Sequence, residues 1–468
     1  MTAATTVDEP TSIFSPPVRA TSVGILIVIT LAAFEAMAVN AAMPTAARAV
    51  DGLGAYGWAF TGFLVATVVG MVAAGQASDR VGAGRPLLAG LASFTLGLLV
   101  GGTATTMAQL VAGRVVQGFG AGLAITAIYV VIGQAYRDDL RPKLFAGISS
   151  AWVVPGLVGP PLSGLVAEHA SWRLVFLALA PFVVLGGVLL LPVVRGLARP
   201  ADPPPFDRQR LVRALAVAGG VAAIASAGLH PSWPALGIAV LGAAAFVWGL
   251  RALLPPGTVR VRPGVGAPIA LRGLFAGAFF GMEAVVPLSL TVQHGFGPFE
   301  AGLPLTVTGV TWFLGSWWQG RTVGDDGHRR RILLIRVGFG LVTLSALGMT
   351  VAVLPGVAGW LAYPLWGLGG FGAGLTMASV GILLLRYTSD ETRGSDSAAL
   401  QLADSTSAAI TTAIGGMLVA AAARGALSDT AAFVTVFVVM GAVALVGALT
   451  AHRARPATRP RGVSPTAS

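Results

Sequence analysis

The sequence contains no cysteine and few charged residues, and both absences restrict what the chain can do. Without cysteine there is no disulfide and no thiolate chemistry. Charged residues make up 10% of the chain, against about 25% in a soluble domain. Hydrophobic residues make up 55%, and apolar surface on this scale needs lipid to cover it. We therefore predict an integral membrane protein.

Residues that could support enzyme or metal chemistry are also scarce. No nucleophile stands beside a candidate base, so we expect no enzymatic activity and no cofactor beyond a proton gradient. The five histidines are too scattered for a metal site and fall in predicted loops or tails: His169, His230, His294, His328 and His452.

Long apolar segments dominate what is present, and each is about long enough to cross a bilayer as a helix. The fold class that we predict is therefore all-α integral membrane, with fourteen transmembrane helices. The predicted spans are 22–44, 57–77, 87–107, 109–132, 144–167, 173–194, 211–229, 235–254, 267–290, 301–320, 332–354, 359–384, 398–423 and 431–451.

The positions of the basic residues set the orientation. Of 30 Lys and Arg, 26 fall in or near the loops and tails on the side of the N-terminus, three (Arg48, Arg173 and Arg424) fall on the other side, and Arg114 lies within a span. Basic residues accumulate on the cytoplasmic side of membrane proteins, so both termini are predicted to be cytoplasmic, in a cell (plasma or inner) membrane. The net charge of +11 is then a topology signal with a secondary role toward anionic lipid, and nucleic acid is not expected as a partner.

A six-residue sequence, Gly-Phe-Gly-Ala-Gly-Leu, occurs at both Gly118–Leu123 and Gly370–Leu375. Chance repetition in a Gly- and Ala-rich chain is one explanation. An internal repeat is the other, and two matches in the same order favour it. Acids lie in the first and ninth spans (Glu35 and Glu283), and Gly-containing basic loops follow the second and tenth.

The repeat predicts two parallel six-helix bundles with pseudo-two-fold symmetry and two helices inserted between them. Bundles of this kind place a substrate site at the midplane. The predicted boundaries are a tail (1–21), the N-terminal bundle (22–194), a linker (195–210), the inserted pair (211–254), the C-terminal bundle (255–451) and a tail (452–468).

Three acids lie within predicted spans: Glu35, Glu283 and Asp404. A charge at the bilayer centre costs roughly 2.5–3.5 kcal/mol, and burial favours the protonated form of a carboxyl. A carboxyl that alternates between a wet and a closed cavity can therefore carry a proton. An interhelical hydrogen bond is the alternative for each, and a vestibule position is a further alternative for Asp404. We expect Glu35, Glu283 and Asn40 to line the substrate cavity.

Arg114 lies within the fourth span, where it could neutralise an intramembrane carboxylate or extend toward the membrane surface. The basic loop between spans two and three is a candidate conformational latch, or an ordinary turn: Gly75, Asp79, Arg80, Gly82 and Arg85. Close helix packing and coupling are expected, against simple kinking, at Gln117, Gly118, Pro155, Gly159, Pro160 and Gly164.

These motifs resemble those of the major facilitator superfamily. The loop Gly75–Arg85 is similar to its cytoplasmic signature, and the sequence from Arg114 to Gly118 to its fourth-helix signature. The sequence Gly159–Gly164 resembles the antiporter signature of the fifth helix, with Ser163 in place of a usual Gly. The sequence Glu35–Pro44 resembles the first helix of the fourteen-helix drug:proton antiporters, which usually have Asp where this chain has Glu35.

The resemblance implies a proton-coupled transporter that exports amphipathic or cationic small molecules by alternating access. The expected partners are its substrate, protons and membrane lipids, and we expect a monomer. Two alternatives remain open: a dedicated exporter of a lipid, siderophore or other metabolite, and a non-transporting membrane sensor.

Overall fold

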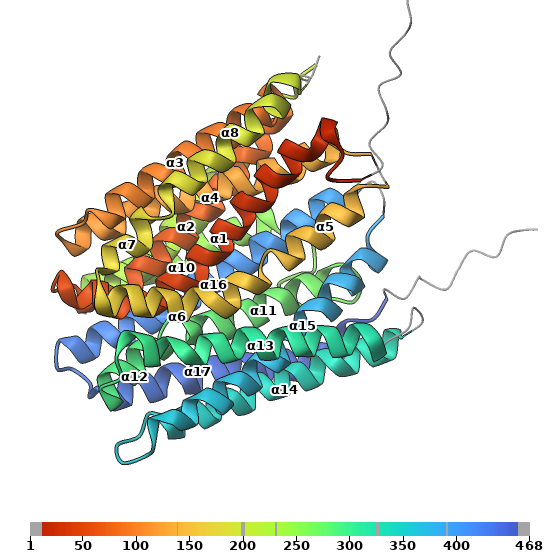
Figure 1. The fold of residues 1–468 in the computed structure, drawn as a ribbon. Coiled ribbons are helices and arrows are strands. Elements are labelled where there is room, and N and C mark those ends of the chain that lie inside the picture. Colours follow the sequence, from red (N-terminus) through yellow and green to blue (C-terminus); the bar gives the residue numbers. More distant parts are fainter. Residues whose placement is uncertain are drawn as a thin grey trace, which may run out of the picture.

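The computed structural model describes residues 12–137, 139–197, 202–229, 232–322, 327–389 and 392–456. Much of both predicted tails and part of the basic loop after the tenth span lie outside these ranges. The described residues form helices and connecting turns without strands (Figure 1). The α-helices are α1 (Pro16–Ala49), α2 (Tyr56–Val81), α3 (Gly84–Gly102), α4 (Met107–Ala135), α5 (Arg141–Ser150), α6 (Val153–His169), α7 (Trp172–Leu177), α8 (Ala180–Gly196), α9 (Arg208–Ala227), α10 (Trp233–Leu253), α11 (Gly266–Glu283), α12 (Val286–His294), α13 (Pro298–Thr322), α14 (His328–Ala352), α15 (Ala362–Tyr387), α16 (Arg393–Ala423) and α17 (Asp429–Thr450); short 3₁₀ turns cover Leu53–Ala55, Gly359–Leu361 and Ala451–Arg453.

Twelve helical stretches of the described chain are long and apolar enough to cross a membrane, so this is a multi-pass membrane protein. The other two predicted spans, 144–167 and 301–320, are helical as well. The first is divided between α5 and α6, and the second lies in the 25-residue helix α13, whose polar residues include Thr308 and Gln319. Fourteen crossings therefore remain a prediction.

Three predicted spans are interrupted by a short break in the helix. The breaks fall between α5 and α6, between α7 and α8, and between α11 and α12. A proline lies within the first three residues after each break: Pro155, Pro181 and Pro287. Proline is tolerated in the first turn of a helix because the backbone N–H that it lacks has no partner there.

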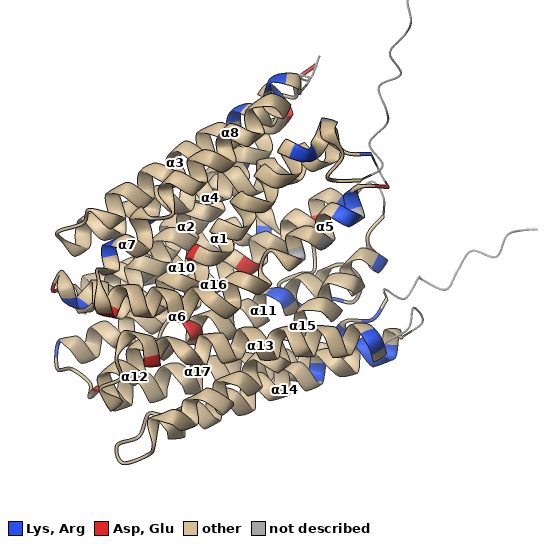
Figure 2. Ribbon diagram, viewed as in Figure 1, with Lys and Arg blue, Asp and Glu red and all other residues tan. Residues whose placement is uncertain are grey.

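The helices lie side by side and alternate in direction, which gives the molecule two ends. The terminal end is defined here as the end where α1 begins and α17 finishes. The distal end holds the connections 50–55 and 424–428 and the end of α9. Lys and Arg gather mostly at the terminal end (Figure 2), in agreement with the charge pattern of the sequence.

The helices α1–α8 pack mainly with one another, as do α11–α17 (Figure 1). These two groups are called the first half and the second half below. They meet where α2 packs on α16 and where α6 packs on α13, and α9 contacts both α2 and α16. A Cβ added at Gly57 of α2 would lie 2.4 Å from the Cα of Gly416 in α16, so the halves are in direct backbone contact near the distal end.

The two copies of the repeated sequence pack in equivalent ways. In α4, Gly118 faces the backbone of α2, since an added Cβ would lie 2.1 Å from the carbonyl oxygen of Phe63. In α15, Gly370 faces the backbone of α13, 2.6 Å from the carbonyl oxygen of Thr308. Lipid supplies no hydrophobic driving force between helices, so backbone approach through small residues contributes much of the packing.

Alanine at either contact glycine should lower thermal stability. Gly118→Ala and Gly370→Ala place a methyl group against backbone atoms that cannot move aside, and overpacking of this kind typically costs about 1–3 kcal/mol. Gly133→Ala in α4 and Gly381→Ala in α15 are matched controls, because a Cβ at either position meets no atom within 4 Å. Thermal unfolding in detergent should separate the two pairs, and equal melting temperatures would contradict this account of the packing.

Candidate substrate and coupling site

A buried ion pair joins α1 to α4. Nη1 of Arg114 donates to Oε1 of Glu35, and the two side chains are only 4% and 1% exposed. Two charges removed from water are tolerated when they neutralise each other and when their remaining polar atoms are also satisfied. The predicted proton-coupling residues Glu35 and Arg114 are therefore in direct contact in this structure.

The guanidinium of Arg114 is fixed on several sides. Its Nε donates to the carbonyl oxygen of Ala59 in α2 at 3.0 Å, and its Nη1 also donates to Oε1 of Gln117 at 2.7 Å. The ring of Phe63 lies against it, 4.2 Å from Cζ to the ring centroid. Arg114 thus points into the bundle and not toward the end of its helix.

The second acid, Glu283, lies at the break between α11 and α12 and is 5% exposed. The side chain of Asn40, on α1, lies near its carboxyl group. One residue further along, the carbonyl oxygen of Ala284 accepts a hydrogen bond of 2.8 Å from the buried hydroxyl of Tyr56 in α2. The Tyr56 hydroxyl therefore links the first half to the break in the second half.

The third acid, Asp404 on α16, forms a bidentate ion pair with Arg272 on α11. The distances are 2.9 Å from Nε to Oδ1 and 3.1 Å from Nη2 to Oδ2, and the side chains are 15% and 17% exposed. The sequence did not reveal this pair, because Arg272 lies near the inner end of the predicted ninth span and was counted with the basic residues of the inner side. A basic residue six positions inside the predicted ninth span was the available signal.

The three acids consequently differ in their electrostatic surroundings. Glu35 and Asp404 each face an arginine, whereas Glu283 contacts no cation among the described residues within 4 Å. A carboxylate at Glu283 would carry a charge that nothing nearby balances. No group of three or more His, Asp or Glu that could hold a metal occurs in the described part of the chain.

The proline- and glycine-rich helix α6 packs between the two halves. Gly159 lies against α1, where an added Cβ would be 3.6 Å from Cβ of Met37, and the Ser163 hydroxyl donates to the carbonyl oxygen of Ala38. Gly164 faces α13, since a Cβ there would lie 2.7 Å from the Cα of Phe299. Pro155 and Pro160 are buried in the same helix. Small residues at these positions let α6 approach both neighbours closely.

The candidate latch is mostly helical, which corrects the expectation of a loop from Gly75 to Arg85. Helix α2 continues to Val81, and the turn consists of Gly82, with φ of +81°, and Ala83. Glycine is favoured at Gly82 because side chains are strained at positive φ.

The polar residues of the candidate latch are exposed, and Gly75 has open space around it. Asp79 makes no hydrogen bond or ion pair within the described ranges. Arg80 lies over the ring of Phe206 in the linker, 5.6 Å from Cζ to the centroid. The structure therefore does not bring Asp79 into contact with a neighbouring helix end.

Comparisons with known proteins agree on one family. The family model described as Major Facilitator Superfamily matches residues 25–370. The chain is 30% identical over 344 residues to MdtD of Salmonella heidelberg (strain SL476), a protein named provisionally for multidrug resistance, and the match covers 69% of each chain. MdtD of Klebsiella pneumoniae subsp. pneumoniae is 29% identical with the same coverage.

Solved structures support the same fold. A POT family transporter in complex with a thioalcohol-conjugated peptide has a TM-score of 0.64 at 14% identity, and the match covers 92% of this chain and 94% of that one. A POT family transporter in complex with 5-aminolevulinic acid has a TM-score of 0.63 with the same identity and coverage.

Removing the arginine of the buried pair should be more damaging than removing both charges. Arg114→Met leaves the Glu35 carboxylate buried without a partner, and breaking a buried pair in this way costs about 3–5 kcal/mol. Glu35→Gln added to Arg114→Met removes that charge, so the double variant should recover part of the lost stability. Thermal unfolding of the single and double variants measures the coupling. Additive effects would show that the two side chains do not interact.

Proposed function

Because this chain belongs to the Major Facilitator Superfamily and is a transporter rather than an enzyme, we propose that it exports amphipathic or cationic small molecules in exchange for protons. The observation that carries the proposal is a pair of buried acids. Glu35 is paired with Arg114 inside the first half, and Glu283, beside the contact with Tyr56, has no cation within 4 Å among the described residues. The multidrug-resistance name of the MdtD relatives supports drug-like cargo.

The proposed architecture follows from charge and helix order. Fourteen crossings, two six-helix bundles (22–194 and 255–451) and an inserted pair (211–254) account for the alternation of the helices. The tails, 1–21 and 452–468, and the linker 195–210 would then be cytoplasmic. The terminal end would face the cytoplasm of a cell-membrane protein, since most Lys and Arg lie there.

Alternating access would use the contact between the halves. The hydrogen bond from Tyr56 to Ala284 and the one from the Phe299 N–H to Glu168 both lie toward the distal end. With the distal end outside, this arrangement is closed to the outside. Opening toward the outside requires α2 to separate from α16, and it requires the hydrogen bond from Tyr56 to Ala284, after Glu283, to break.

Proton coupling would divide between the two glutamates. Protonation of Glu35 removes its attraction for Arg114, which frees the guanidinium to move with α4. At Glu283 a proton or a cationic cargo can balance the same negative charge, so each would displace the other. This competition makes export of a cation depend on entry of a proton. The Arg272–Asp404 pair would then lie at the cavity wall.

Transport in proteoliposomes with an imposed pH gradient and a panel of cationic dyes tests the proposal. The wild-type chain should move dye only with the gradient, and Glu35→Gln and Glu283→Gln should each abolish gradient-driven movement when equal amounts of folded protein are compared. Glu300→Gln, which alters an exposed acid at the distal end, is the control and should transport normally.

Three results would reject the proposal. Unchanged gradient-driven flux in both glutamine variants would remove the coupling role of these acids. Movement of a lipid or metabolite alone, with no dye moved, would support a dedicated exporter, and no movement of any compound would favour the sensor.

Asp79 is proposed to latch the outward-facing state, in which the terminal ends of the halves approach one another. Asp79 has no partner among the described residues in the present arrangement, which agrees with a released latch. An exposed ion pair contributes only about 0–1 kcal/mol, which still shifts a near-balanced equilibrium by up to about fivefold. Asp79→Asn should therefore slow cycling and increase the inward-facing population without changing cargo selectivity.

Spin labels at Ala146→Cys and Gly394→Cys report the separation of the halves at the terminal end. Gly394 is exposed with open space around it, so a label there should not disturb α16. Asp139→Asn, at another exposed acid of the same end, serves as the control. If Asp79→Asn has the wild-type distance distribution, Asp79 is a turn residue only.

A further inference from the structure

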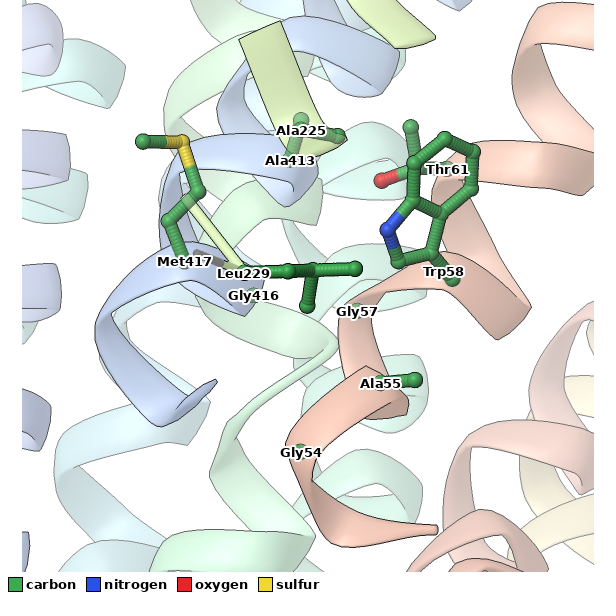
Figure 3. A pocket seen from close by; sticks show the side chains of 10 residues that line it. All are labelled: Gly54, Ala55, Gly57, Trp58, Thr61, Ala225, Leu229, Ala413, Gly416 and Met417. Carbon is green, nitrogen blue, oxygen red and sulfur yellow. The ribbon is translucent and has the colours of Figure 1, made fainter. Parts of the chain in front are cut away.

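Two buried polar atoms near the distal end of α2 have no hydrogen-bond partner. They are the indole Nε1 of Trp58 and the hydroxyl Oγ1 of Thr61, whose side chain is 1% exposed. Both line a cleft enclosed by α2, α9 and α16, and in Figure 3 the two atoms point to the same side of it. Buried polar groups normally have a partner, so a ligand with a hydrogen-bonding oxygen is expected here.

The cleft itself admits only a small group. Its volume is about 10 Å³, which is about the room for one water-sized oxygen group. Trp58 can only donate a hydrogen bond, whereas Thr61 can donate or accept. The ligand atom in the cleft must therefore accept a hydrogen bond, as a carbonyl oxygen does.

An apolar groove of about 430 Å³ lies on the other side of Trp58. One wall consists of Met107, Ala108, Val111 and Ala112 in the first turns of α4, and Trp58 and Leu229 contribute to the opposite wall. Trp58 and Leu229 also line the cleft, so the two spaces adjoin. No charged residue lines either space, which suits a hydrocarbon chain and not an ionic group.

A cation stands beside this pair of spaces. Arg424, at the distal end of α16, is exposed and donates from Nη2 to the carbonyl oxygen of Gly228 at 2.9 Å, next to Leu229. It is one of only three basic residues on the side opposite the termini. An exposed arginine at this level is placed to attract a phosphate group.

We infer that this is a binding site for a glycerophospholipid of the leaflet at the distal end. An acyl chain lies in the groove between α2 and α4, an ester carbonyl accepts from Trp58 and Thr61, and the phosphate lies near Arg424. Carbonyl, chain and phosphate adjoin in this way in a glycerophospholipid, and the surrounding membrane supplies it. The lipid would sit where α2, α9 and α16 meet, beside the contact between Gly57 and Gly416.

The site can be tested by photolabelling with phosphatidylglycerol that carries a diazirine in its acyl chain. The full-length protein is reconstituted in nanodiscs, and labelled peptides are mapped by mass spectrometry. Labelling should concentrate on the first turns of α4 and fall severalfold in Ala108→Trp, which fills the groove. Ala431→Trp is the matched control, because Ala431 is an exposed alanine in the first turn of α17.

The polar contacts have their own test. Thr61→Val removes a hydroxyl and keeps the shape of the cleft, whereas Trp58→Phe removes the indole N–H together with part of the ring. Each should reduce the phospholipid retained in native mass spectra after delipidation. Arg424→Gln should reduce retention in the same way.

Three outcomes would overturn the inference. One is labelling spread evenly over the lipid-facing helices and unaffected by Ala108→Trp. Another is a density map with a single water between Trp58 and Thr61 and an empty groove. The third is displacement of the phospholipid by a transported dye, which would make the site a cargo site. Dye transport itself can persist in every case, so failure here leaves the proposed function untouched.

Discussion

A charge inside a lipid-embedded bundle has to be balanced nearby, and the Glu35–Arg114 pair is where this requirement organises the first half of the molecule. The guanidinium bonds to α1 through Glu35, to α2 through Ala59 and to its own helix through Gln117. Three helices are therefore held in one register by a single side chain. If α4 moves relative to α1, the two side chains of the pair must follow the helices, or the charges of the pair must be neutralised.

Helices in lipid must also hold together without a hydrophobic effect between them, and close backbone contact provides this cohesion. The same glycine-rich sequence occurs in α4 and α15, and in each it meets the backbone of two neighbouring helices of its own half. Between the halves, Gly57 and Gly416 meet in the same manner. Contacts of this kind have no side chain to rearrange, so the helices separate or stay together as rigid bodies.

Much of the architecture could be predicted from the sequence. The bilayer determines how long an apolar segment must be to cross it, and arginine accumulates in the loops on one side of it. The membrane class, the helical architecture and the burial of Glu35 and Glu283 follow from such patterns. The helix breaks did not, since Pro and Gly are tolerated in transmembrane helices and do not reveal which one interrupts the chain. The partner of Asp404 was missed because pairing between α11 and α16 depends on helix packing, which spacing along the chain does not encode.

The break between α11 and α12 has a consequence for how selectivity could change. The last carbonyl groups of a helix have no partner within it and carry partial negative charge. At this break, beside Glu283, the carbonyl oxygens of Phe280 and Met282 each accept one backbone hydrogen bond, and that of Ala284 accepts one from Tyr56. Main-chain oxygens stay in place whatever side chain is substituted. A preference for positively charged cargo at this point would therefore persist when nearby side chains are substituted. Such substitutions could change which cargo shapes are accepted without changing the preferred charge.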